Sequence, residues 1–169
     1  MFSTSKSLRN LALAAAGAAA LAFMALPAPV QASTSPFHAL SGSWAGGGTI
    51  TMASGAKERL RCRARYDVNG SGSAVDLRLR CASDSFTFEL QSNAGYENGA
   101  VSGNWSETTR GVGGSLEGRA RGNRIDVRVS GIISALLAVS TNANQQSISI
   151  EAPGTEMAAV AISMSRGSK

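Results

Sequence analysis

The most regular pattern in the chain is an alternation of apolar and basic positions between residues 59 and 81. The basic positions are Arg61, Arg63 and Arg65 in a first run and Arg78 and Arg80 in a second. Successive side chains of a strand point to opposite faces, so both runs predict strands with one apolar and one basic face. The two cysteines of the chain, Cys62 and Cys81, fall on the apolar face.

Similar short runs recur along the rest of the chain, separated by clusters of Gly, Asn and Ser. They predict strands at Gly42–Met52, Glu58–Val68, Ala74–Cys81, Ser85–Gln91, Gly99–Glu107, Val112–Arg121, Arg124–Ser130, Ser134–Ser140, Gln145–Glu151 and Ala159–Arg166. Residues 132–139 would also suit a two-turn helix, although we favour a strand there.

Short connections favour antiparallel pairing between neighbouring strands. A meander of about eight to ten strands with one apolar face has to close or fold over itself to hide its edges. We therefore expect an all-β fold, an antiparallel up-and-down barrel, with a β-sandwich as the alternative. The run Gly46–Gly48 is interpreted as a bend in the first strand.

Two hairpins differ in the charges that they bring together. The Gly122-Asn123 turn predicts oppositely charged outer pairs, with Arg119 opposite Asp126. Placing Cys62 opposite Cys81 gives an outer face of like charges instead. The pairs in that hairpin are Arg63 with Arg80, Arg65 with Arg78, and Asp67 with Asp76. Like charges directly opposite each other destabilise a sheet.

The strands on either side supply few acidic side chains to neutralise these arginines. The predicted registers place Glu89 beside Arg78 and Gly47 beside Arg63. Arginine binds carboxylate and phosphate groups through its planar fork. We therefore predict an anion-binding surface made of Arg61, Arg63, Arg65, Arg78 and Arg80. The alternative is a solvated outer face whose long side chains spread apart.

Residues 1–32 have the pattern of a secretory signal peptide. Lys6 and Arg9 precede the apolar run Leu11–Leu26, and small side chains stand at the expected cleavage site after residue 32. A membrane anchor is the alternative, but the run is short for a span of ~20 residues. We expect a flexible lead-in at 33–40, a single barrel domain at 41–169, and a periplasmic or secreted location in a bacterium.

Export changes how the charge and the cysteines are interpreted. The whole chain carries a net charge of +5, and removing Lys6 and Arg9 leaves 14 basic against 11 acidic residues. This modest excess does not suggest nucleic acid as a ligand. In an exported chain, Cys62 and Cys81 predict a disulfide, with two buried thiols as the alternative. A zinc centre would lack its preferred ligands, and we expect no metal or cofactor.

The chain offers few residues for catalysis. Its single histidine, His38, lies in the expected lead-in, where nothing would hold it for nucleophilic chemistry. Glu89 and Glu107 could serve a two-carboxylate hydrolase, but nothing in the pattern brings them together. We therefore expect a protein that is not an enzyme.

Aromatic residues on the inner faces suggest a second kind of site. If the barrel encloses a cavity, its lining would include Trp44, Tyr66, Phe86, Phe88 and Trp105. Barrels of about eight strands can hold one small molecule. The alternative is that both tryptophans plug the ends of the core.

Three segments carry a resemblance to known proteins. Residues 40–44 (LSGSW), 61–63 (RCR) and 101–108 (VSGNWSET) resemble short exported alphaproteobacterial proteins without an assigned activity. The first of them is also similar to the opening strand of avidins, and its Gly-x-Trp to that of lipocalins. The resemblance implies a small exported barrel and brings no catalytic residues with it.

Three binding roles follow as expectations. The arginine face would dock an anionic envelope component, or the interior would carry a small apolar ligand. As a third role, loops such as Tyr96–Gly99 and Thr108–Gly111 would serve a protein-interaction or protease-inhibitor module, as in similar small barrels of periplasmic inhibitors. After cleavage no membrane span is expected, because one strand face is basic and the other is needed for the core.

Overall fold

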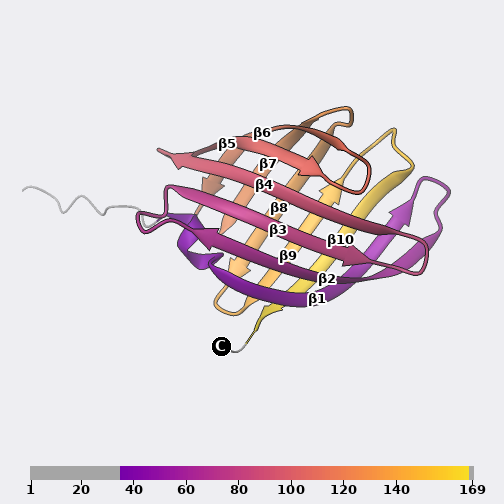
Figure 1. Cartoon of the computed structure of the whole chain (residues 1–169), viewed down its shortest axis with the longest axis horizontal. Helices are drawn as coiled ribbons and strands as arrows, with labels where there is room; N and C mark the ends of the chain where they lie inside the picture. The colour runs from indigo at the N-terminus through magenta and orange to yellow at the C-terminus, as the bar shows by residue number, and fades with distance from the viewer. Residues whose placement is uncertain (1–34, 168–169) are drawn as a thin grey trace, which may run out of the picture. The chain divides into compact units, whose positions relative to one another are not determined.

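Every predicted strand is present, and each pairs antiparallel with its neighbours in the sequence (Figure 1). The computed structural model describes residues 35–167, and the predicted signal peptide lies outside them. The strands are β1 Gly42–Met52, β2 Lys57–Val68, β3 Ala74–Ala82, β4 Thr87–Glu97, β5 Ala100–Glu107, β6 Val112–Arg121, β7 Arg124–Gly131, β8 Ala135–Asn142, β9 Gln145–Glu151 and β10 Met157–Arg166.

The ten strands form a closed barrel, because β1 pairs with both β2 and β10. Closure removes the free edges that would otherwise pair with other chains. The predicted barrel is therefore confirmed over the sandwich alternative. The strand interpretation of residues 132–139 is also confirmed from Ala135 onward, since β8 pairs with β7 on one side and β9 on the other, while residues 132–134 precede the strand. Within the described residues, no helix is long and apolar enough to cross a membrane.

Glycines in β1 permit a close approach to β10. A Cβ atom on Gly48 would lie 1.9 Å from the carbonyl oxygen of Ala161, and one on Gly46 would lie 2.0 Å from that of Ser163. No side chain fits at such distances, so these positions require glycine. β1 curves strongly along this stretch (Figure 1), as expected for a bend at Gly46–Gly48.

The predicted registers of the β2–β3 and β6–β7 hairpins are confirmed, but the registers on either side of the β2–β3 hairpin are shifted by two residues. Gly47 lies beside Arg61 rather than Arg63, and Glu89 lies beside Arg80 rather than Arg78. A shift of two keeps every side chain on its predicted face. The turns explain both shifts.

The β1–β2 turn closes with a hydrogen bond from the Met52 amide to the Ala56 carbonyl, and Gly55 adopts a left-handed φ of +86° there. In the β3–β4 turn, the Ser83 amide donates to the Phe86 carbonyl at 2.7 Å. The Ser83 hydroxyl also accepts a hydrogen bond from the Phe86 amide. Both turns are therefore held one residue away from the predicted positions.

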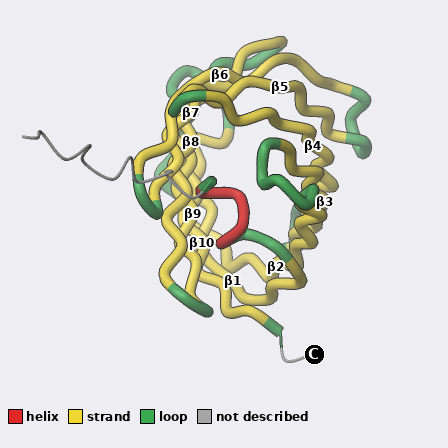
Figure 2. The backbone as a smooth tube through the Cα atoms, turned by 90° about the vertical axis from the view of Figure 1, so that its left-hand side faces the viewer, coloured by secondary structure: helices red, strands yellow, loops and turns green. Residues whose placement is uncertain are grey.

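One end of the barrel is closed by a short 3-10 helix, η1 (Pro36–Ala39), which crosses the opening in Figure 2. Phe37 is only 1% exposed, and its ring lies 5.9 Å from that of Tyr96. The indole nitrogen of Trp44 donates to the Leu40 carbonyl at 2.7 Å. The described part of the expected flexible lead-in is thus packed rather than loose, because Phe37 and Leu40 are apolar and the barrel end gives them a place to be buried.

Candidate binding site on the barrel wall

The outer face of β2 and β3 carries the five predicted arginines, and we call it the arginine wall: Arg61, Arg63, Arg65, Arg78 and Arg80. The disulfide between Cys62 and Cys81 is confirmed, and both cysteines are buried on the inner side. Arg63 pairs with Arg80 across the two strands, and Arg65 with Arg78. The structure therefore brings all five arginines onto one exposed surface.

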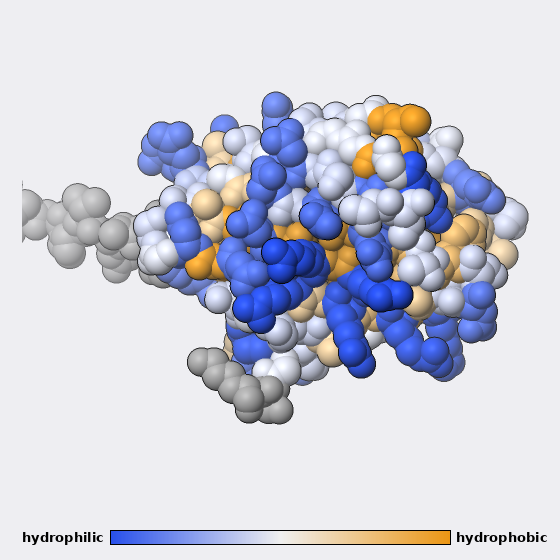
Figure 3. Space-filling view, in the orientation of Figure 1, coloured by the Kyte–Doolittle hydropathy of each residue, from blue (hydrophilic) through white to orange (hydrophobic). Residues whose placement is uncertain are grey.

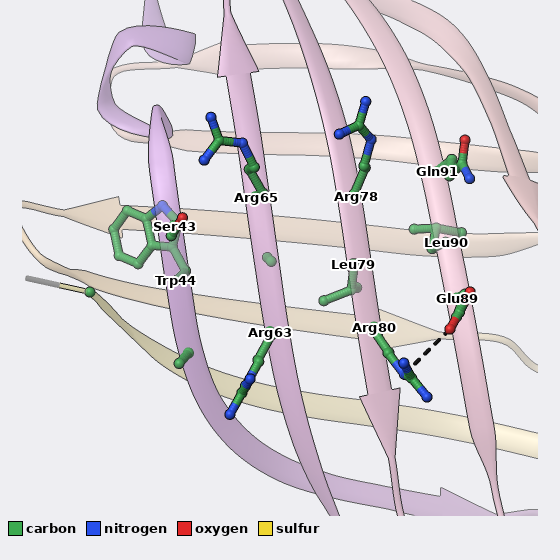
Figure 4. Close-up of a pocket in the computed structure, with 13 residues that line it drawn as sticks. Ser43, Trp44, Arg63, Arg65, Arg78, Leu79, Arg80, Glu89, Leu90 and Gln91 are labelled. Carbon is green, nitrogen blue, oxygen red and sulfur yellow. Dashed lines mark ion pairs between the residues drawn. The ribbon is translucent and has the colours of Figure 1, made fainter. Parts of the chain in front are cut away.

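A groove of about 470 Å³ crosses this wall (Figure 4). It lies between two cross-strand rows of residues that run from β1 to β4. One rim is the row Ser43, Arg65, Arg78 and Gln91, and the other is the row Ala45, Arg63, Arg80 and Glu89. The floor is the row between them, Trp44, Ala64, Leu79 and Leu90. The side chains of the floor turn inward, so the groove is shallow and its base is sheet backbone.

The arginines lean away from the groove. In Figure 4, Arg65 and Arg78 point in one direction and Arg63 and Arg80 in the other, which leaves the floor uncovered. The two members of each opposed pair lean the same way, so this arrangement separates one row of arginines from the other. Figure 3 shows hydrophilic side chains gathered over β2–β4 with apolar surface between them.

Acids neutralise part of this surface. Arg65 forms an ion pair with Asp67 at 3.0 Å, and Arg80 forms one with Glu89 at 3.3 Å. Among the described residues, no carboxylate lies within 4.0 Å of the guanidinium groups of Arg61, Arg63 or Arg78. Each rim of the groove thus holds one arginine with an acidic partner and one without.

Four of the five predicted interior aromatic residues lie in or against one core cluster: Trp44, Tyr66 and Trp105 belong to it, and Phe88 packs against it. Trp105 donates its indole N–H to the Ser130 carbonyl at 3.1 Å, while Trp44 binds Leu40 on another side of the barrel. Phe88 is partly buried against the core, and Phe86 lies in the β3–β4 turn.

A buried polar chain crosses the interior near η1. The Tyr66 hydroxyl donates to the Gln146 side chain at 3.0 Å, and the Gln146 amide donates to Thr141 at 3.2 Å. Burial raises the pKa of Tyr66 far above its usual value and outweighs the opposing effect of Gln146, so the phenol stays neutral. The chain connects β2 to β8 and β9, and it occupies this end of the barrel.

The two carboxylates considered for hydrolysis have different surroundings. Glu89 faces outward in its ion pair with Arg80, whereas Glu107 is buried at the β5–β6 turn. Burial alone raises the pKa of Glu107, but hydrogen bonds from Thr109 and from the amides of Glu89 and Arg110 outweigh it and lower the pKa to about 2. The ionised carboxylate of Glu107 therefore holds the β5–β6 turn in place through these hydrogen bonds.

The loops of the proposed interaction module lie at opposite ends of the barrel. Tyr96–Gly99 is at the end closed by η1, where Tyr96 contacts Phe37, and Thr108–Gly111 connects β5 and β6 at the other end. They do not form one surface. In the described part of the chain, no cluster of three His, Cys, Asp or Glu side chains is arranged to hold a metal ion.

One residue that contacts the floor of the groove, Arg166, was not predicted from sequence. The Arg166 guanidinium lies 4.4 Å from the centre of the Trp44 ring and donates to the carbonyls of Ala39, at 2.6 Å, and Ser41. It joins η1, β1 and β10 at the β1 end of the groove. Only the closure of β10 on β1 reveals this position, because Trp44 and Arg166 are paired across that junction.

Comparison with known proteins supports the fold. No family model and no curated protein matches the chain. Several solved structures are similar to it in fold, and two of them are as follows. Rv2717c from M. tuberculosis superposes with a TM-score of 0.62 at 13% identity, covering 83% of this chain and 99% of that one. The S-type phycobiliprotein lyase CPES from Guillardia theta gives a TM-score of 0.58 at 8% identity, covering 79% of this chain and 91% of the lyase.

Both neighbours are β-barrel proteins. At such low identity the likeness extends to the fold alone. The chain therefore belongs to the class of closed antiparallel β-barrels, and its function has to be argued from its own residues.

Proposed function

We propose that this protein binds an anionic component of the cell envelope through the groove in its arginine wall, without catalysis. The observation that carries the proposal is the pair of directly opposed arginines on each side of the groove, Arg63 with Arg80 and Arg65 with Arg78. Such pairs destabilise an isolated sheet. A bound anion would convert this repulsion into attraction.

The unpartnered arginines supply the binding groups. Arg63 and Arg78 stand diagonally across the groove, one on each rim, and neither has an acid within 4.0 Å among the described residues. A guanidinium binds carboxylate or phosphate oxygens in a bidentate geometry. A change of rotamer in each of these exposed side chains would bring both groups over an anion in the groove.

Arginine substitutions test the proposal. The variant Arg63→Gln/Arg65→Gln/Arg78→Gln removes three charges from the groove. The control Arg119→Gln/Arg121→Gln/Arg128→Gln removes three exposed charges from β6 and β7. Binding is measured to lipopolysaccharide, to phosphatidylglycerol vesicles and to polygalacturonate. We expect the parent and the control to bind at least one of them, and the groove variant to bind at least about tenfold more weakly, equivalent to ~1.4 kcal/mol.

Equal weakening in both triple variants would show that net charge alone matters and would contradict the proposal. Absence of binding by the parent to all three ligands would contradict it as well. Binding through surface charges weakens as salt is added, because the charges are screened over about 10 Å at 0.1 M. A salt titration therefore identifies the type of contact.

The barrel form of the solved neighbours supports a second candidate function, the carriage of a small apolar ligand. At the end opposite η1, inner residues such as Phe88, Leu137 and Met157 are only partly buried against the core. An apolar ligand held there would bind independently of salt. Retention of a small apolar molecule by both triple variants, unaffected by salt, would favour this function.

A further inference from the structure

We infer that the ligand of the groove is an acidic polysaccharide, lying lengthwise across the strands from β1 to β4. This inference rests on the proposed function and specifies its ligand. It is carried by the shape of the groove and by the placement of charge along both of its rims.

The length and width of the groove match those of a short segment of a linear polymer. Neighbouring strands are about 4.8 Å apart, so four strands give a length of roughly 14 Å, comparable to a trisaccharide. The two rims are two residues apart along each strand, which gives a width of roughly 7 Å. A chain one sugar ring wide therefore fits between the rims.

Apart from Glu89, which forms an ion pair with Arg80, the polar side chains of the rims match an acidic sugar chain. Guanidinium groups stand on both rims, with Arg65 and Arg78 on one and Arg63 and Arg80 on the other. Carboxylates that project to both sides of a polysaccharide would each meet an arginine fork. Ser43 and Gln91 border the same groove and offer hydrogen bonds to hydroxyl groups.

The groove does not stop a polymer at either end. Beyond the β1 end, Ala45 is paired with Ser165, and Gly167 borders the groove. Beyond the β4 end, Gln91 is paired with Ser106. These side chains are small or absent and uncharged, so a chain longer than the groove could continue over them.

An extended acidic peptide fits less well. Every strand of the barrel is paired on both sides, so the floor has no free backbone groups for an added strand. The amides of a peptide in the groove would lose water without gaining partners. A sugar chain has no such backbone and keeps its outward hydroxyl groups in water.

A lipid bilayer also fits less well. The exposed arginines border the floor on two sides, so a flat surface would contact the guanidinium groups without entering a groove roughly 7 Å wide. The groove itself would then have no role in binding. A variant that fills the groove and keeps every arginine separates these cases.

The test uses Ala45→Trp, which places a large ring at the β1 end of one rim. Its control, Ala161→Trp, places the same ring on the outer face of β10, away from the groove. Binding is measured to polygalacturonate, trigalacturonate, uncharged dextran, phosphatidylglycerol vesicles, polyglutamate and inorganic pyrophosphate. We expect the parent and the control to bind polygalacturonate most tightly and dextran not at all. Ala45→Trp should bind polygalacturonate at least about tenfold more weakly and pyrophosphate as the parent does.

Other outcomes overturn the inference. Equal polygalacturonate binding by Ala45→Trp and Ala161→Trp would exclude the groove as the site of the chain. Tighter binding to vesicles or polyglutamate than to polygalacturonate would assign the surface to a membrane or an acidic peptide. In either case, pyrophosphate binding that is lost in the arginine variant would leave the proposed anion-binding function standing.

Discussion

The arginine wall and a second wall of the barrel both bury apolar residues on their inner faces but differ on their outer faces. The outer faces of β8, β9, β10 and β1 form a small-residue wall, whose central positions are Thr49, Ala138, Ser140, Ser147, Ser149, Ala161 and Ser163. Within this wall, the cross-strand neighbours at these positions are glycine, alanine, serine and threonine, and no like charges are opposed. The arginine wall opposes like charges twice across one pair of strands.

This difference shows that the fold constrains the inner-face positions of each strand more than the outer-face positions. Burial requires apolar residues on the inner face of both walls, but it places no such demand on the outer face. The small-residue wall proves that uncharged outer positions suit this barrel. We therefore expect that folding does not require the arginines at positions 63, 65, 78 and 80, as would hold for residues that serve binding.

The largest effect should come from removing the disulfide under the arginine wall. For Cys62→Ala/Cys81→Ala we expect the free energy of unfolding to fall by ~2–5 kcal/mol, because the crosslink restricts the unfolded chain. The loss should be greater at low ionic strength, where repulsion between Arg63 and Arg80 is less screened. Urea unfolding at two salt concentrations measures both effects.

A matched variant sharpens this result. Adding Arg80→Gln to the cysteine variant should recover part of the loss at low salt, whereas adding Arg119→Gln on β6 should not. A loss that is the same at both salt concentrations, and unaffected by Arg80→Gln, would show that the disulfide does not hold repelling strands together.

The sequence predicts registers well only where local chemistry specifies them. The Gly122-Asn123 turn and the two cysteines each single out one register, and both predictions are confirmed. The hydrophobic pattern cannot distinguish registers that differ by two residues, since both bury the same side chains. The registers that Gly55 and Ser83 determine were therefore missed.

These registers explain why the groove could not be predicted. Its rims exist because Ser43 and Ala45 align with Arg65 and Arg63, and these alignments depend on the β1–β2 turn. Individual ion pairs are equally hard to predict. Asp126 lies opposite Arg119 as expected, but its carboxylate binds Arg124 on its own strand at 2.7 Å. The choice between such partners depends on side-chain conformation, which periodicity does not encode.

A smaller loss of stability is expected when Glu107 is replaced. Its carboxylate accepts a hydrogen bond from the Glu89 amide of β4 at 3.0 Å. The pKa of Glu107 is about 2 in the folded protein, below its usual value of 4.5. Its contribution is therefore fully present above about pH 4.5 and is lost as the pH falls towards 2. Glu107→Gln should lower the free energy of unfolding by ~1–3 kcal/mol at pH 7.

The pH dependence separates this cause from a packing defect. The difference between the parent and Glu107→Gln should shrink as the pH falls from 4.5 to 2, because protonation removes the same charge from the parent. Glu156→Gln, at an exposed turn position, should change stability by less than ~0.5 kcal/mol. A difference between the parent and Glu107→Gln that stays constant with pH would rule out the carboxylate charge as its source.

The smallest effect tests the comparison between the walls most directly. Arg78→Thr makes one position of the arginine wall resemble the small-residue wall and removes the repulsion from Arg65. We expect the free energy of unfolding to rise by ~0.2–1 kcal/mol while anion binding weakens. Arg119→Thr gains the same strand propensity but loses an oppositely charged neighbour, Asp126, so it should not be stabilised.

Opposite signs in these two variants would separate charge from strand propensity. An equal rise in both would mean that threonine suits any outer position of the barrel and that the opposed arginines cause no destabilisation. A rise for Arg78→Thr alone, together with weaker anion binding, would mean that the arginine wall lowers stability in order to bind. A binding surface would show this trade-off between stability and affinity, whereas a merely solvated surface would not. The small-residue wall has no opposed charges, so no such trade-off is expected there.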